Sequence, residues 1–135
     1  MPTAEQIQSL IAPLFPGLMG LKIEEVTRDK VIASLLVRPD LCTTGGVCHG
    51  GALMAFADTV GAIGTVANLP AGARTTTIES KTNFVGAARV DTRVTAESVP
   101  LHRGRTTQVW QTTIRSEDSK LVAVVTQTQM VLPAR

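Results

Sequence analysis

The stretch that decides the fold runs from Thr43 to Ala67 and reads TTGGVCHGGALMAFADTVGAIGTVA. Two glycine pairs flank His49, and a long apolar run follows in which Asp58 is the only other ionisable residue. The run predicts a helix from about His49 to Ala67 that ends near Asn68. Because its apolar residues occupy every side of the helical wheel, we expect this helix to be buried all round.

Asp58 and the glycine at the start of the helix are candidate catalytic groups. A carboxylate in apolar surroundings carries a desolvation cost of several kcal/mol unless it is hydrogen-bonded or protonated. The backbone N–H of Gly50 lies at the positive end of the helix macrodipole, where a developing negative charge is stabilised. An oxyanion donor and a buried carboxylate in one short segment indicate an active site.

Helical geometry predicts that these two groups act in different subunits. His49 and Asp58 are nine positions apart, which is half a turn net and about 13.5 Å along the helix axis. A reacting carbonyl must lie about 3 Å from both the donor and the base. Two copies of the helix packed antiparallel bring the start of one to the middle of the other. We therefore expect a homodimer with two composite sites, each using Gly50 of one chain and Asp58 of its partner.

Size and composition exclude several classes of protein. A chain of 135 residues, 44% hydrophobic and 18% charged, is long enough for one globular domain over residues 1–135. With 3% aromatic residues and a net charge of +2, neither nucleic acid nor an anionic membrane is an expected partner. No signal peptide or membrane-spanning pattern is present, so we expect a cytoplasmic protein.

The remaining sequence predicts a fold of the α+β class. A capping box at Thr3 begins an amphipathic helix through Leu14, which Pro16 and Gly17 should stop. A loop is expected over residues 39–48. Strands are expected over residues 20–27, 30–38, 74–85, 88–99, 104–116 and 120–132. One apolar helix among so many strands indicates a curved antiparallel sheet wrapped around that helix.

Several motifs resemble the hotdog-fold acyl-CoA thioesterases, and the PaaI-like (phenylacetate-pathway) branch most closely. The sequence His49-Gly-Gly, with Asp58 nine positions after the histidine and Thr59 next, is similar to the HGG…DT signature of that family. Weaker similarities cover nearly the whole chain, in the segments TTTIESKTNFVGAA (residues 75–88), HRGR (102–105) and LVA (121–123).

The resemblance implies hydrolysis of a thioester between an acyl group and coenzyme A, with no metal or organic cofactor. It implies that the Gly50 amide holds the oxyanion, and that Asp58 of the partner acts as general base or as nucleophile. It also implies a homodimer and its assembly into a homotetramer. Many relatives carry Asn or Gln where this chain has Thr43, which leaves the positioning of water open. Relatives often have Ser or Thr on the next strand, where Thr76 is the nearest match.

His49, Gly51 and the two cysteines of the chain lie in or beside the motif. His49 is expected to cap the helix and fix the loop rather than to carry protons, and Gly51 is a candidate for substrate binding. The pair Cys42 and Cys48 matches no common metal-site spacing.

Three arginines are candidates for contacts to the nucleotide phosphates, and the alternative for each is a solvated surface position. They are Arg89, Arg103 and Arg105. Two further functions stay open for the whole chain, namely a non-catalytic acyl-CoA or acyl-carrier binding module and, on the spacing of the carboxylate less favoured, a hotdog dehydratase.

Overall fold

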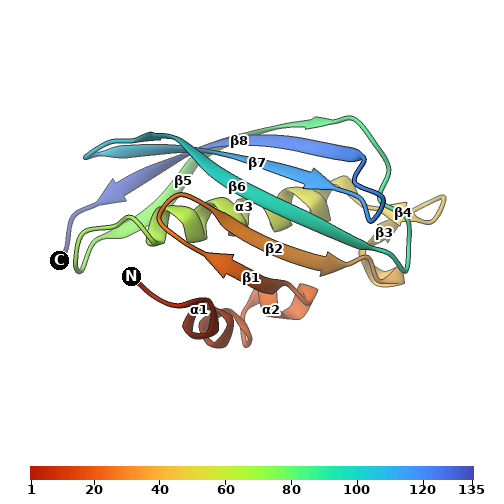
Figure 1. The fold of residues 1–135 in the computed structure, drawn as a ribbon, viewed down its shortest axis with the longest axis horizontal. Coiled ribbons are helices and arrows are strands. Elements are labelled where there is room, and N and C mark those ends of the chain that lie inside the picture. Colours follow the sequence, from red (N-terminus) through yellow and green to blue (C-terminus); the bar gives the residue numbers. More distant parts are fainter.

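The fold is one curved antiparallel sheet that wraps around a central helix, as expected from the sequence (Figure 1). The structure is a computed structural model that describes all residues from 1 to 135. Its elements are α1 (Ala4–Ile11), α2 (Phe15–Met19), β1 (Lys22–Val26), β2 (Val31–Leu36), the 3-10 turn η1 (Pro39–Leu41), β3 (Cys42–Thr43), β4 (Val47–Cys48), α3 (Gly50–Val66), β5 (Arg74–Phe84), β6 (Arg93–Arg103), β7 (Thr107–Arg115) and β8 (Leu121–Leu132).

The N-terminal helix differs from its prediction. The capping box at Thr3 is present, but α1 ends at Ile11 rather than continuing to Leu14. Pro16 does not stop a helix, because it lies in the first turn of α2, where a missing N–H costs nothing. The second helix ends instead at Gly20, whose φ of 87° is the left-handed conformation that glycine adopts readily.

The six long strands are ordered β1-β2-β6-β7-β8-β5, all antiparallel. The consecutive strands expected over residues 74–85 and 88–99 do not pair with each other as a hairpin. Strand β5 pairs with β8 and β6 pairs with β2, because residues 85–92 cross between the two sides of the sheet. The N–H groups of Val85 and Gly86 both donate to the Val122 carbonyl during this crossing. Consequently β6 begins at Arg93 rather than at residue 88.

The expected end of a strand at residue 99 is also wrong, since residues 100–103 belong to β6. The strand accommodates Pro100 with a register shift between Pro100 and His102. A bulge is the usual site at which a strand tolerates proline.

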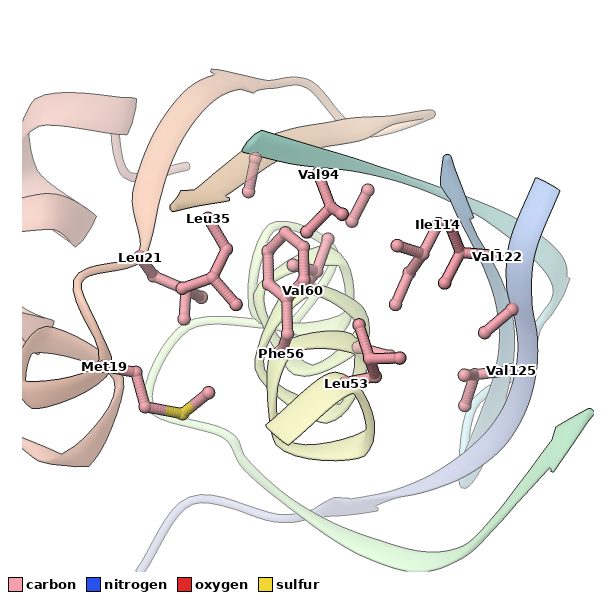
Figure 2. Packing of buried hydrophobic residues seen from close by; sticks show 14 of the residues in the cluster. Met19, Leu21, Leu35, Leu53, Phe56, Val60, Val94, Ile114, Val122 and Val125 are labelled. Atoms are coloured by element: carbon pink, nitrogen blue, oxygen red, sulfur yellow. The ribbon is translucent and has the colours of Figure 1, made fainter. Parts of the chain in front are cut away.

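Helix α3 lies inside the curve of the sheet, and its apolar side chains meet those of the strands (Figure 2). Phe56 and Val60 of α3 are fully buried against this core. Gly61 and Gly64 face the sheet so closely that an added Cβ would lie 2.2 Å from the Gln127 side chain and 2.6 Å from the Trp110 ring, respectively. The glycines therefore bring helix and sheet into direct contact. None of the helices combines the length and apolar character needed to span a bilayer.

The expectation that α3 is buried all round is wrong for one subunit. A stripe of the helix at three- and four-residue spacing is half-buried or exposed, and it consists of Gly51, Met54, Ala55, Asp58, Ala62 and Val66. Met54 and Val66 are each 39% exposed although both are large and apolar. The sheet of a single subunit thus covers only part of the helix circumference.

Candidate active site

The start of α3 leaves one backbone donor free. His49 is the N-cap, and its Nδ1 atom accepts a hydrogen bond of 2.8 Å from the Gly51 N–H. The N–H groups of Ala52 and Leu53 donate to the His49 carbonyl. The Gly50 N–H has no acceptor within the subunit. The histidine is therefore a cap, as expected, and the Gly50 amide stays available to a ligand at the positive end of the helix.

A two-strand ribbon holds the loop before the helix. Gly45 and Gly46 have φ values of 87° and 70° and form the turn between β3 and β4. The ribbon is anchored where the His49 N–H donates to the Leu41 carbonyl and the Cys48 N–H donates to the Ala88 carbonyl. Its own residue Thr43 is exposed. The two glycines therefore serve a turn that fixes the position of His49.

The two cysteines lie opposite each other on this ribbon, where Cys42 of β3 pairs with Cys48 of β4. Both are free thiols. Cys48 is buried, and this burial, with a smaller contribution from Cys42, raises the pKa of its thiol from 9.0 to about 11. A thiol kept neutral in this way is a poor nucleophile.

Asp58 lies in the middle of the open stripe of α3. Its Oδ1 atom accepts a hydrogen bond of 3.1 Å from the Thr77 hydroxyl on β5, and no cation pairs with it in the subunit. Thr77, not Thr76, is the strand residue in contact with Asp58 within one subunit, while Thr76 is exposed. The carboxylate is thus half-buried, bound by one hydroxyl and carried on the stripe of α3 that the subunit leaves open.

Two buried glutamines behind Asp58 were missed from the sequence. Gln127 and Gln129 of β8 are 0% and 1% exposed, and they hydrogen-bond to each other and to the surroundings of Asp58. The alternation in VVTQTQM was a usable signal, because it places both glutamines on the same face of the strand as the buried Val125. A polar residue on the core side of a strand requires a partner.

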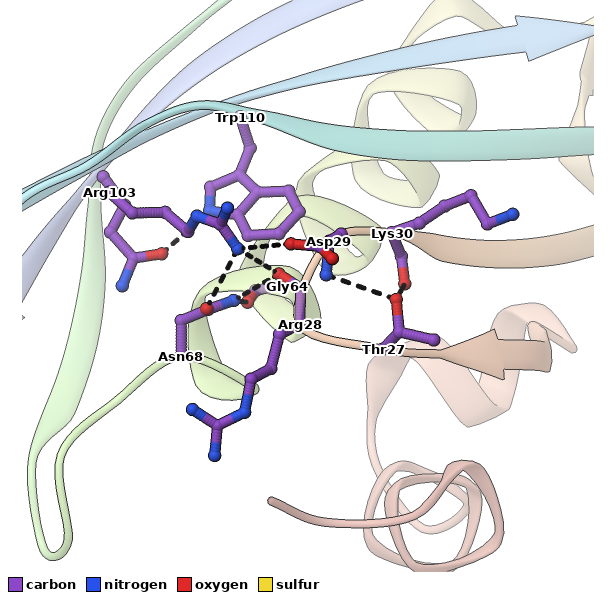
Figure 3. Close-up of polar contacts among 9 residues, drawn as sticks. Thr27, Arg28, Asp29, Lys30, Gly64, Asn68, Arg103 and Trp110 are labelled. Carbon is purple, nitrogen blue, oxygen red and sulfur yellow. Dashed lines mark hydrogen bonds and ion pairs between the residues drawn. The ribbon is translucent and has the colours of Figure 1, made fainter.

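The structure separates the three candidate arginines. Arg89 lies beside the start of α3, where it bridges to Val47, and it lines a polar groove of about 590 Å³. Arg103 lies at the other end of α3, and its guanidinium donates to the Arg28 carbonyl and to Asp29 Oδ1, both at 2.8 Å (Figure 3). Arg105 is exposed beyond the end of β6. Within the subunit only Arg89 is placed near Gly50.

A second cleft opens at the same end of α3. It has a volume of about 420 Å³ and is mostly apolar, with Phe15 and Leu18 of α2 on one side and His49 and Gly51 on the other. Gly50 and Asp58 remain eight positions apart on one straight helix, which is about 12 Å along its axis. One subunit therefore does not bring both groups to one reacting carbon.

Comparison with known proteins shows the family of this chain. The family model described as "Thioesterase superfamily" matches residues 45–123. A thioesterase structure from Haemophilus influenzae is 30% identical, with a TM-score of 0.92, and the match covers 98% of this chain and 92% of that one.

Two Escherichia coli proteins are also similar. The first is named 1,4-dihydroxy-2-naphthoyl-CoA hydrolase, and it is 27% identical over 119 residues, which cover 88% of this chain and 87% of the relative. The second is the PaaI protein of the phenylacetic acid degradation operon, which is 19% identical with a TM-score of 0.85, covers 97% of this chain and 94% of its own, and shares the fold. The chain therefore belongs to the thioesterase superfamily, with the hotdog fold of its PaaI-like branch and the activity of a thioester hydrolase.

Proposed function

We propose that this protein is an acyl-CoA thioesterase whose active site is shared between two subunits. The Gly50 N–H of one subunit binds the carbonyl oxygen of the thioester, and Asp58 of the other provides the carboxylate. The observation that carries the proposal is the unpaired Gly50 N–H at the start of a helix that carries its only carboxylate eight positions later. A fixed donor of this kind lowers the barrier when the carbonyl oxygen becomes negative.

The open stripe of α3 and the free edge of the sheet support a dimer. Strand β5 is at the edge of the sheet and is eleven residues long. On and beside it Ile78, Phe84 and Val85 are more than half exposed. A long, unpaired edge strand with exposed large apolar side chains promotes unwanted association in a monomer. A second copy that pairs with β5 covers this edge and the stripe with Met54 and Asp58, and it explains why α3 is apolar on all sides.

The chemistry of the composite site follows from its two groups. In the general-base route, Asp58 takes a proton from water as the water oxygen attacks the thioester carbon. The carbonyl oxygen becomes negative against the Gly50 N–H, the C–S bond breaks, and the thiolate of coenzyme A takes up a proton. In the nucleophilic route, the carboxylate attacks the thioester carbon and displaces coenzyme A as its thiolate, which takes up a proton. Water then cleaves the mixed anhydride into the free acid and the Asp58 carboxylate. Both routes need a charged Asp58 and no cofactor.

The surroundings of the Gly50 amide suit the two ends of an acyl-CoA. The apolar cleft next to His49 and Gly51 suits the acyl group, and the E. coli relative named as a naphthoyl-CoA hydrolase makes aryl esters a reasonable first choice. Arg89, in the polar groove, is the arginine best placed for the phosphates of coenzyme A.

The direct test is release of free thiol from a panel of aliphatic and aryl CoA esters, with Asp58→Asn as the variant. We expect turnover to fall by orders of magnitude in Asp58→Asn while the protein stays folded, because the amide neither accepts a proton nor attacks. Equal rates in the two proteins would remove Asp58 from the mechanism. Binding of a CoA ester without turnover of any ester would instead indicate an acyl-CoA binding module.

A further inference from the structure

A hydrogen-bonded row of side chains leads from Asp58 into the core. Thr77 Oγ1 lies 3.1 Å from Asp58 Oδ1 and 2.6 Å from Gln129 Oε1. A hydroxyl carries one proton, so Thr77 donates to only one of these two acceptors at a time. The Thr77 hydroxyl therefore donates either to Asp58 or to Gln129, and the two arrangements suit different protonation states of Asp58.

The second acceptor is held in place. Gln129 Oε1 also accepts a hydrogen bond of 3.0 Å from Gln127 Nε2, and Gln129 Nε2 donates to Thr75 Oγ1 at 3.0 Å. Gln127 Nε2 in addition lies 3.2 Å from the Asp58 carbonyl oxygen, which ties the pair to the helix itself. These contacts fix the amide of Gln129 with its oxygen towards Thr77. Both glutamines are excluded from water, so no solvent molecule replaces this acceptor.

This arrangement satisfies Asp58 in both of its protonation states. When Asp58 is charged, the Thr77 hydroxyl donates to its carboxylate. When Asp58 has accepted a proton on Oδ1, that proton is donated to Thr77 Oγ1, and the Thr77 hydroxyl turns to Gln129 Oε1. A general base passes through both states in each turnover, and a partner that serves only one of them would favour that state.

We propose that Thr77 and Gln129 form a two-position hydrogen-bond switch that supports Asp58 both before and after it takes a proton from water. Thr77 is the positioning residue in contact with Asp58, and Gln129 acts through it. The inference rests on the proposed function, in its general-base form.

Within the subunit, no other ionisable residue contacts Asp58 and alters the balance between its two protonation states. Strands β2 and β8 and helix α2 have no ionisable residue, and Asp58 is the only one in α3. The ionisable residues of the other strands around α3 are all exposed and do not contact Asp58, namely Arg74, Glu79, Lys81, Arg93, Glu97, His102, Arg103 and Arg115. In the proposed dimer, the partner's His49 and the partner's Arg89 are the ionisable groups near the Gly50 amide, and both are unchanged in every variant below.

The experiment measures kcat/KM against pH for thiol release from a CoA ester that the wild type hydrolyses. Thr77→Val removes the donor to the charged carboxylate, so the acid limb moves to higher pH by up to about one unit. Gln129→Met removes the acceptor that serves the protonated state, so the limb moves to lower pH by a few tenths of a unit. Thr77→Ser keeps the hydroxyl and restores the wild-type profile. Both Thr77→Val and Gln129→Met lower kcat more than they raise KM, because neither side chain is needed to bind substrate.

Gln108→Met is the matched control, because Gln108 is also a buried glutamine and pairs with Gln129 across β7 and β8. It bonds to Trp110 and not to Asp58, so its loss lowers stability and leaves the acid limb in place. Acid limbs that move in opposite directions in Thr77→Val and Gln129→Met support the switch. If Asp58→Asn is inactive but the acid limbs of Thr77→Val and Gln129→Met stay in place or move in the same direction, the switch is overturned and the proposed function is not. Turnover that survives in Asp58→Asn overturns the proposed function as well.

Discussion

The two ends of α3 use glycine for opposite purposes. At the start, Gly50 has an unpaired N–H, and the nearest side chain is Phe84, which is 51% exposed. Near the end, Gly64 packs against the fully buried ring of Trp110, and its carbonyl accepts a hydrogen bond of 2.9 Å from Asn68 (Figure 3). The first glycine leaves backbone accessible to a ligand, and the second closes a gap between helix and sheet. The proposed oxyanion donor thus lies at the loosely covered end.

The largest effect is expected from Gly50→Pro. Proline at the first position of a helix suits the backbone but has no N–H, so it removes the oxyanion donor with little cost to folding. We expect kcat for thioester hydrolysis to fall by about 10²- to 10³-fold. Gly50→Ala is the control, because it adds a Cβ against the same Phe84 ring and keeps the N–H. A similar loss in both variants would mean that space, rather than the donor, is what Gly50 supplies.

The packed end is tested by Gly64→Ala. In an open helix this change stabilises by about 1 kcal/mol, but here the new Cβ would lie 2.6 Å from the Trp110 ring. We expect the free energy of unfolding to fall by about 1 to 3 kcal/mol, as measured by denaturant titration at fixed protein concentration. Gly50→Ala should change it by less than about 0.5 kcal/mol. A more stable Gly64→Ala protein would show that the two ends do not differ in packing.

Cys48 is buried, and it lies directly before His49, the exposed cap of α3. Its pKa is raised from 9.0 to about 11, so the thiol stays neutral in the folded state while it ionises in the unfolded one. The contribution of the neutral Cys48 thiol to the free energy of unfolding is complete below pH 9, and it is lost as the pH rises towards 11. Between pH 9 and pH 10 we expect a loss of about 1 kcal/mol in unfolding free energy. Cys48→Val should lack this slope, and an equal slope in both proteins would assign it to other groups.

The smallest effects should come from the arginines at the two ends. Arg89→Gln is expected to raise KM for acyl-CoA a few-fold, and more at low salt, because a phosphate contact is lost. Arg103→Gln breaks a pair with the exposed Asp29 and should lower stability by less than about 1 kcal/mol with KM unchanged. The reverse pattern would place the phosphates at the end of α3 near Asn68.

The sequence was sufficient where one physical requirement determines the structure. The long apolar run identified α3, and the position of His49 directly before that run predicted its role as the cap. Strand pairing was predicted less well, because the β5–β8 and β2–β6 contacts join segments distant in the sequence. The strand was expected to end before Pro100, because a bulge leaves no local signal in the sequence.

In the candidate site, the sequence predicted Gly50 and Asp58 as the catalytic groups, but it did not predict the side chains that surround Asp58. Contact of Asp58 with Thr77 rather than Thr76 depends on which face of β5 meets α3. The ion pair between Arg103 and Asp29 joins the end of β6 to the turn between β1 and β2, and these two segments meet only in the folded chain.

The central claim is that one site needs two subunits, and complementation tests it directly. Asp58→Asn and Gly50→Pro subunits with different affinity tags are co-expressed, and mixed dimers are isolated through both tags. Each homodimer should be inactive, whereas the mixed dimer has one site with an intact Gly50 and an intact Asp58, so we predict about half of the wild-type rate per dimer. A mixed dimer as inactive as its parents would contradict a site built across the interface.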